Sequence, residues 1–226
     1  MEKSKLGFQK VSAIFGLLAG LCLIIYLLGN MSLSAPESDS PEVVIQWTKD
    51  NVTALLFTFP FAVIAMVFFG VLMHGIHERF KAFSSPLASL SLHLGWMTLL
   101  LKILFLASNW FHFYFISVVW DNETASQYFR LTNDLSNFFH VSSLPFLAAW
   151  LFVAGIGGLI SQGFSRIFAA ISILFGVCVV LSFLGWHWKA LSALPSVIDF
   201  IATYAWVILI WASIELLVRK QSAQAG

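Results

Sequence analysis

Three charged residues of this chain lie in stretches that are otherwise strongly apolar. Lys102 stands inside the apolar run 94–118, while Asp199 and Glu215 lie near the two ends of the run 197–218. Burying an ionisable side chain in hydrocarbon costs several kcal/mol, so such residues mark ligand, ion or proton sites in membrane proteins. We therefore look for function first around Lys102 and its neighbours.

Lys102 belongs to a polar stripe on one face of the helix that the run 94–118 predicts. At about 100° per residue, one arc of this helix holds Ser91, Gly95, Thr98, Lys102, Asn109 and His112. Similar faces occur on two other predicted helices, one with Asn133, Ser136, His140 and Ser143, the other with Ser196, Asp199, Thr203, Trp206 and Ser213. A polar stripe on an apolar helix is expected to face a bundle interior. We predict a polar intramembrane cavity lined by Lys102, Asn109, His112, His140 and Asp199.

Two interpretations of Lys102 remain open. Its ammonium can extend along the helix to the lipid headgroups, as long basic side chains commonly do. Alternatively it meets an internal carboxylate or the anionic group of a ligand. Lys102 is nearer in predicted depth to Glu215 than to Asp199, but Glu215 stands four residues before Arg219, the spacing of an ordinary pair on a helix surface.

Three histidines are expected on the outer side of the membrane and could converge beneath the outer loops. They are His112, His140 and His187, with Asp199 as a carboxylate neighbour. Imidazoles with a carboxylate bind Zn²⁺ or copper, and paired imidazoles on separate helices ligate haem. The sequence has neither a His-X-X-Glu-His nor a Cys-X-X-Cys motif. We therefore predict no cofactor and keep a transition metal or haem as the alternative.

The elements that must position these residues are membrane-spanning helices. The chain has 226 residues, of which 59% are hydrophobic and 10% are charged, whereas soluble domains carry about 25% charged residues. A spanning helix needs about 20 mainly apolar residues. Six runs are long enough, at residues 11–28, 52–73, 94–118, 143–160, 167–184 and 197–218. We predict an all-α, six-helix polytopic bundle that forms one integral membrane domain over residues 1–226.

Basic residues set the orientation, because loops rich in Lys and Arg stay in the cytoplasm. With a cytoplasmic N-terminus, that side holds Lys3, Lys5, Lys10, Arg79, Lys81, Arg166, Arg219 and Lys220, and the other side holds Lys49, Arg130 and Lys189. Both termini are therefore predicted to be cytoplasmic. Residues 29–51 and 121–134 are then polar, acidic outer loops. With 12 basic against 11 acidic residues, no basic excess exists to bind nucleic acid.

Small residues lie at helical spacing in the first and fourth predicted spans. They are Ser12, Gly16 and Gly20 in the first, and Gly155, Gly157 and Gly158 in the fourth. Small residues let helices approach closely in lipid, where packing drives association. With six helices to pack, contacts within the chain are favoured over a homodimer, and the oligomeric state stays open.

This layout resembles a family of bacterial six-helix integral membrane proteins of unknown function. The resemblance is carried by the basic N-terminus with Gly16 and Gly20, the acidic outer loop, the second span ending in residues 70–77, and the glycines of residues 150–160 before a short turn at 161–166. It implies a six-helix fold and a location in the bacterial inner membrane. It implies no activity and no site residues.

Two classes of function fit these observations. The first is a non-enzymatic accessory, sensing or small-ligand-binding component of the membrane that uses the predicted cavity. The second is a membrane-embedded redox or metal-dependent enzyme that uses the outer-side histidines. The chain has no phosphate loop, serine-hydrolase elbow or Gly-rich nucleotide fingerprint, and this favours the first class. The expected partners are the lipid bilayer and a small ligand or another membrane protein.

Overall fold

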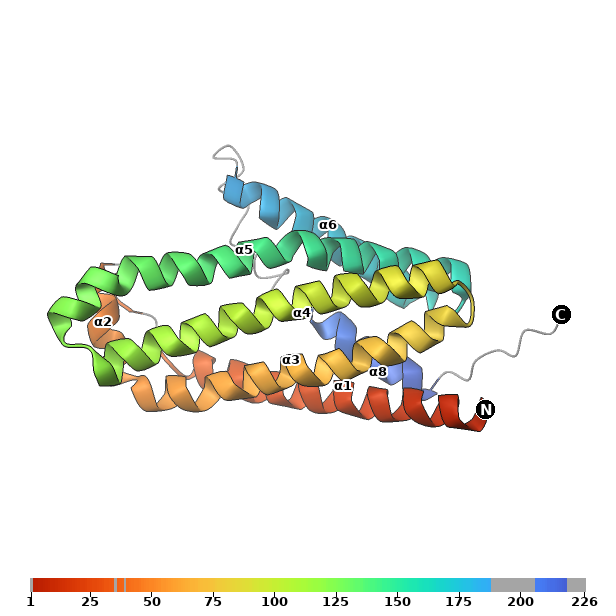
Figure 1. Ribbon diagram of the computed structural model, residues 1–226, viewed down its shortest axis with the longest axis horizontal. Helices are drawn as coiled ribbons and strands as arrows, with labels where there is room; N and C mark the ends of the chain where they lie inside the picture. Colours follow the sequence, from red (N-terminus) through yellow and green to blue (C-terminus); the bar gives the residue numbers. More distant parts are fainter. Residues whose placement is uncertain (1, 35, 39, 188–205, 219–226) are drawn as a thin grey trace.

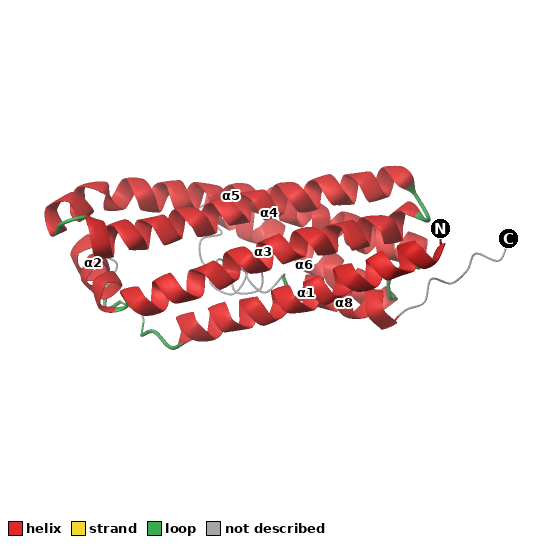
Figure 2. Cartoon of the chain, turned by 60° about the horizontal axis from the view of Figure 1, so that its bottom comes forward, coloured by secondary structure: helices red, strands yellow, loops and turns green. Residues whose placement is uncertain are grey.

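The computed structural model describes residues 2–34, 36–38, 40–187 and 206–218. In these ranges the chain forms seven α-helices and one short π-helix joined by brief connections, with no strand (Figure 2). The elements are α1 (Glu2–Met31), α2 (Pro41–Asp50), α3 (Val52–Lys81), α4 (Ser85–Tyr114), η1 (Phe115–Val119), α5 (Asn122–Ser161), α6 (Arg166–His187) and α8 (Val207–Val218). The prediction of an all-α protein is confirmed.

Five helical segments of the described chain are long and apolar enough to cross a membrane. They are Gly7–Met31, Val52–Lys81, Ser85–Val119, Asn122–Ser161 and Arg166–Gly185. These five correspond to the first five predicted spans, so the chain is a polytopic membrane protein. Of the sixth predicted span, 197–218, only residues 206–218 are described, and helix α8 has 12 residues. That length is short of the about 20 residues a span requires.

The long helices lie side by side along the longest axis of the molecule (Figure 1). Helix α3 packs between α1 and α4, α5 packs between α4 and α6, and α8 packs against α1. The turns from α3 to α4 and from α5 to α6 lie at the same end as the N-terminus, which we call the amino end. Helix α2 and the turn from η1 to α5 lie at the opposite end, which we call the loop end.

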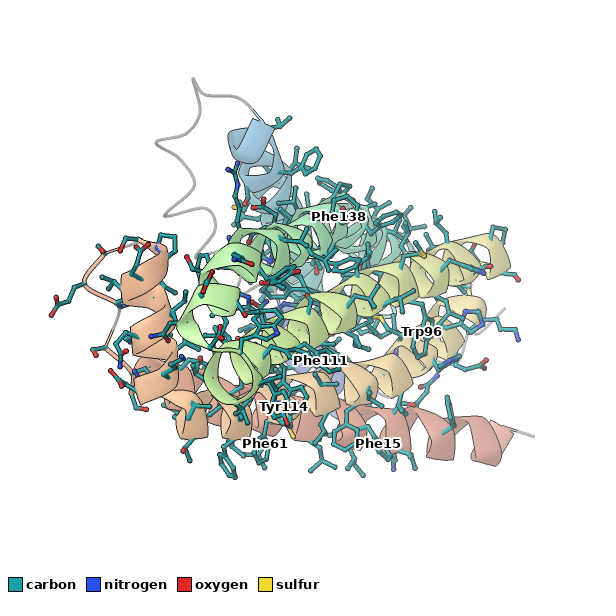
Figure 3. All side chains as sticks on the ribbon, turned by 60° about the vertical axis from the view of Figure 1, so that its left-hand side comes forward. Phe15, Phe61, Trp96, Phe111, Tyr114 and Phe138 are labelled. Carbon is teal, nitrogen blue, oxygen red and sulfur yellow. The ribbon has the colours of Figure 1, made fainter. Side chains whose placement is uncertain are left out.

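The outside of this bundle is apolar, as lipid contact requires. Figure 3 shows Phe111 and Phe138 pointing away from α4 and α5, and both side chains are more than half exposed. The interior is filled by large side chains that are almost fully buried, among them Phe69, Leu99 and Trp150. A bundle with apolar residues on both its inner and outer faces is stable only in a hydrocarbon solvent.

Residues 121–134, predicted as an outer loop, are helical from Asn122 onward, so that prediction is wrong. Asp121 begins α5 because its carboxylate accepts a hydrogen bond from the backbone N–H of Thr124 at 2.8 Å. The polar residues that follow lie mainly on exposed faces of the helix. Helix α5 has 40 residues, which at about 1.5 Å each gives a rod of about 60 Å, twice the about 30 Å thickness of membrane hydrocarbon.

The other predicted outer loop, 29–51, contains the short helix α2. Ser40 caps it by accepting a hydrogen bond from the N–H of Val43. Its buried Ile45 packs in a small separate core with Ile116 and Ala125. Lys49 of α2 donates a hydrogen bond to the amide oxygen of Asn122 at 2.5 Å. Helix α2 therefore packs against η1 and the beginning of α5.

The small residues of α1 are used inside the chain, as predicted. A Cβ atom added at Gly16 would lie 2.0 Å from the hydroxyl of Ser213, and one added at Gly20 would lie 2.9 Å from Ile210. Ser12 is fully buried and faces Gly75 of α3. Because the backbones approach this closely only through small side chains, Gly16 and Gly20 set the distance between α1 and α8.

Candidate functional site

A cavity of about 500 Å³ lies within the bundle, between α1, α3, α4, α5 and the beginning of α8. Its described lining is mainly apolar: Gly20, Leu23, Ile24, Tyr26, Leu27, Ala62, Met66, Lys102, Phe105, Leu106, His140, Leu144, Trp206, Val207 and Ile210. Lys102 is the residue of this lining that carries a full charge at neutral pH. Apolar walls with a few converging polar groups are typical of small-ligand sites.

Lys102 and His140 come from neighbouring helices and meet at the wall of this cavity. The Lys102 ammonium lies 3.0 Å from Nδ1 of His140. The Phe105 ring lies beside both groups, 5.4 Å from the Lys102 Nζ and 5.0 Å from the His140 ring centroid. Lys102 is only 8% exposed. Its side chain therefore stays inside the bundle, and the interpretation that it extends to the headgroups is wrong.

The hydrogen bond fixes the roles of the two groups. An ammonium can only donate, so Nδ1 of His140 must accept. A neutral imidazole that accepts at Nδ1 carries its proton on Nε2. The pair therefore brings an ammonium and an imidazole from two neighbouring helices together at one place.

His112 belongs to the same face of α4 but to another level of the bundle. Its Nδ1 lies 2.5 Å from the hydroxyl of Thr132 on α5, and its ring packs on Phe129. It follows Lys102 by ten residues, which is about 15 Å along the helix axis. The side chain of Asn109 donates to the backbone carbonyl of Phe105 at 3.1 Å. The described lining of the cavity includes neither His112 nor Asn109.

Of the five residues predicted to line a cavity, the structure thus brings Lys102 and His140 together. Asp199 lies outside the described residues. The predicted polar face of α4 points inward, because Ser91, Gly95, Thr98, Lys102 and His112 are all buried.

The three histidines proposed as metal ligands cannot be compared as a set, because the side chain of His187 lies outside the described part of the chain. His112 bonds to Thr132, which lies eight residues before His140 on α5. Eight residues correspond to about 12 Å along this helix, so His112 and His140 lie at different levels. Among the described residues, no three His, Cys, Asp or Glu side chains are grouped closely enough to hold a metal ion. A metal or haem site on His112, His140 and His187 stays a prediction.

A second buried polar cluster, at the amino end, was not predicted. The carboxylate of Glu215 accepts hydrogen bonds from the backbone N–H of Ser165 at 2.6 Å, from the Ser165 hydroxyl, and from Nε1 of Trp211 at 3.0 Å. Glu215 is 7% exposed, so it is not the surface residue that its spacing from Arg219 indicated. Arg219 lies outside the described residues. A serine directly before an apolar helix is a capping signal, but nothing in the sequence pairs it with Glu215.

Arg79 forms the other half of this amino-end cluster. It donates from Nε to the backbone carbonyl of Gly163 at 2.9 Å and from its guanidinium to the side chain of Gln9 at 3.4 Å. Its guanidinium also lies 5.9 Å from the centre of the Phe164 ring. Arg79 is 4% exposed. It therefore connects α1, α3 and the turn from α5 to α6, in which Gln162 adopts a left-handed conformation.

A scan against protein-family models and searches of curated proteins and of solved structures find nothing that matches this chain. The resemblance to a bacterial six-helix family is therefore carried by the layout of the sequence alone. The fold supports the coarser description, a polytopic helical membrane protein.

Proposed function

We propose that this chain is a non-enzymatic membrane component that binds a small ligand in the cavity between α1, α3, α4, α5 and α8. The observation that carries the proposal is the Lys102–His140 pair at the wall of a mainly apolar cavity of about 500 Å³. Ligand sites occupy about 300–1,000 Å³ and orient their ligands with a few polar groups. A buried charge inside a membrane is also retained chiefly where it serves a function.

Retention of a ligand by the purified protein tests this proposal. Native mass spectrometry of protein extracted in mild detergent should detect a bound non-protein mass. Ala62→Phe should reduce it, because Ala62 lines the cavity and a phenyl ring there occupies part of the space that the ligand needs. Ile64→Phe is the matched control, since Ile64 is 41% exposed on the outside of the same helix.

Equal retention by the two variants would overturn the proposal. The thermal unfolding of each variant in detergent shows whether it is folded. If Ala62→Phe does not fold, Ala62→Leu fills less of the cavity and allows the same comparison.

We further propose a bacterial inner-membrane location, six spans and cytoplasmic termini. The basic residues Lys10, Lys81 and Arg166 lie at the amino end, whereas Glu42 and Glu123 lie at the loop end. This distribution supports cytoplasmic placement of the amino end.

Single-cysteine labelling tests the orientation, after Cys22 and Cys178 have been replaced by serine. A membrane-impermeant maleimide added to intact spheroplasts should modify Ser38→Cys at the loop end. It should modify Phe83→Cys, in the turn from α3 to α4, only after the membrane is permeabilised. The reverse pattern would invert the proposed topology.

A further inference from the structure

We propose that the cavity takes one hydrocarbon chain of a bilayer lipid, which enters sideways between α1 and α8. This inference rests on the proposed function, because it names the chemical class of the ligand and its route into the cavity. Three features of the molecule support it: the surface that lines the cavity, the packing of α1 against α8, and the exposure of two residues at the edge of the cavity.

The lining of the cavity favours hydrocarbon over water. Apart from Lys102 and His140, which bond to each other, its described residues are small, aliphatic or aromatic. A water molecule inside a protein needs about 2–4 polar partners, and apolar cavities stay dry. An empty cavity is also unfavourable, because the side chains around it lose dispersion contacts. A hydrocarbon chain restores these contacts without requiring a hydrogen bond.

Helices α1 and α8 are in close contact on the side of the cavity that faces the amino end. The two helices are antiparallel, because Gly16 lies against Ser213 and Gly20 lies against Ile210. Backbones that approach through glycine in this way leave no gap for a lipid chain. The boundary between α1 and α8 is therefore closed from Gly16 to Gly20.

This boundary opens one turn beyond Gly20. The next position on the same face of α1 is Ile24, and the antiparallel packing places it opposite Val207 at the beginning of α8. Both residues line the cavity, and both are about half exposed. Ile24 belongs to the candidate membrane span Gly7–Met31. Among the described residues, Ile24 and Val207 thus border an opening that faces hydrocarbon, which we call the side opening.

Aromatic rings hold the walls beside the side opening in place. Trp206 stacks on Phe69 of α3, with ring centroids 5.9 Å apart and planes 13° apart. Tyr26 packs edge-on against Phe59 at 5.4 Å. The cavity is therefore shaped before a chain enters, and a shaped cavity lowers the cost of binding.

Photoreactive lipids test this inference. The full-length protein is reconstituted in nanodiscs with phosphatidylcholine or phosphatidylglycerol that carries a diazirine in the middle of one acyl chain. After irradiation, the labelled residues of α5 are located by fragmentation mass spectrometry. Leu144 is compared with Leu151, because both are almost fully buried and lie about two turns apart on α5. Of these two residues, Leu144 lines the cavity and Leu151 does not.

Leu144 should be labelled at least about tenfold more than Leu151, the factor that a free-energy difference of 1.4 kcal/mol gives. The two lipids should label Leu144 equally, because the chain and not the head group occupies the cavity. Ile156 of the same helix is exposed and should be labelled in every sample, since it contacts lipid directly.

Val207→Trp should block the side opening and reduce the labelling of Leu144. Ile214→Trp is the matched control, because Ile214 is about half exposed on the same helix, about two turns further on, and does not line the cavity. The comparison of Leu144 with Leu151 in the unchanged chain decides the occupant even where Val207→Trp does not fold. Unchanged labelling of Leu144 in a folded Val207→Trp variant would overturn the entry between α1 and α8.

The outcomes separate this inference from the proposed function. Labelling of Leu144 by one of the two lipids alone would overturn recognition of the chain and leave a cavity that binds a ligand through its head group. No labelling of Leu144 by either lipid, with a bound mass still detected by native mass spectrometry, would overturn the hydrocarbon chain and leave the proposed function. A chain that shows neither labelling of Leu144 nor a bound mass would overturn both.

Discussion

The carboxylate of Glu215 on α8 accepts a hydrogen bond from the backbone N–H of Ser165, 50 residues earlier in the chain, at 2.6 Å. The hydroxyl of Ser165 donates to the same carboxylate and accepts from the N–H of Phe168 in the first turn of α6. A negative charge is thus held at the positive end of the α6 helix dipole. Glu215 thereby fixes the last described helix to the beginning of α6.

Removing this carboxylate should destabilise the protein strongly. In Glu215→Ala the donors of Ser165 and Trp211 lose their acceptor. Since each buried donor without a partner costs about 1–3 kcal/mol, we expect a loss of at least about 2 kcal/mol, measured by thermal unfolding in detergent. Glu215→Gln keeps one acceptor oxygen and should lie between Glu215→Ala and the unchanged chain.

Asp134→Ala is the control for this measurement. The Asp134 carboxylate is 65% exposed and lies 3.7 Å from Arg130, and exposed ion pairs contribute only about 0–1 kcal/mol. A Glu215→Ala variant that melts like Asp134→Ala would contradict the structural role of Glu215.

Arg79 should not be replaceable by lysine. Its Nε and its terminal guanidinium nitrogen reach two acceptors, Gly163 and Gln9, that lie in different parts of the chain. A lysine ammonium has only one nitrogen and cannot donate to both of these acceptors in the same geometry. In Arg79→Lys we expect faster amide exchange in the turn from α5 to α6 and a lower melting temperature. Lys81→Arg, at an exposed position two residues away on the same helix, should change neither.

A side chain at Gly16 should separate α1 from α8. The Cβ of Gly16→Val would overlap Ser213 and Leu72, and overpacking of this kind costs about 1–3 kcal/mol or more. Gly7→Val is the matched control, since nothing lies within 4 Å of a Cβ added there. Thermal unfolding of the two variants should differ clearly. Similar melting of both would show that the two helices can move apart freely.

The stability of the first turn of α5 should depend on pH through the carboxyl group of Asp121. The hydrogen bond from the Thr124 backbone N–H holds the pKa of the Asp121 carboxyl below its ordinary value of 3.8. Because this pKa is lowered, the contribution of the cap to stability is complete above pH 3.8. It is lost as the pH falls through the lowered pKa. Amide exchange at Thr124, corrected for its intrinsic rate, should therefore accelerate only in strong acid.

Asp121→Asn is the control, because asparagine caps helices without titrating. Its Thr124 amide should show protection that does not change with pH. An acid-dependent loss of protection in Asp121→Asn equal to that of the unchanged chain would assign the effect to another group.

Local patterns predicted much of this fold from the sequence. Five of the predicted apolar runs are long helices in the structure. The helical wheel of residues 91–112 predicted one polar face, and its members Ser91 and Lys102 lie on the buried face of α4. The spacing of Gly16 and Gly20 predicted close packing inside the chain. Each of these predictions depends on periodicity within one helix, which is a property of neighbouring residues.

Contacts between distant segments could not be predicted in the same way. His140 lies on a polar face, but only the alignment of α4 with α5 decides that it meets Lys102 rather than His112. The bond between Glu215 and Ser165 depends on how α8 lies against α6. The helical start of α5 was missed because its residues are polar, and the absence of an apolar run indicated a loop where the Asp121 cap begins a helix.

The length of α5 predicts a water-exposed segment of the protein that is helical rather than a loop. Helix α5 is about twice as long as membrane hydrocarbon is thick, and Lys49 of α2 donates a hydrogen bond to Asn122 at its beginning. Proteases cut extended chain, and a hydrogen-bonded helix must unwind locally before it can enter their active sites. The beginning of α5 should therefore be exposed to solvent and still resist cleavage. With the loop end on the extracytoplasmic side, as proposed above, a protease added to intact spheroplasts should leave the beginning of α5 uncut, whereas small labelling reagents should reach it freely.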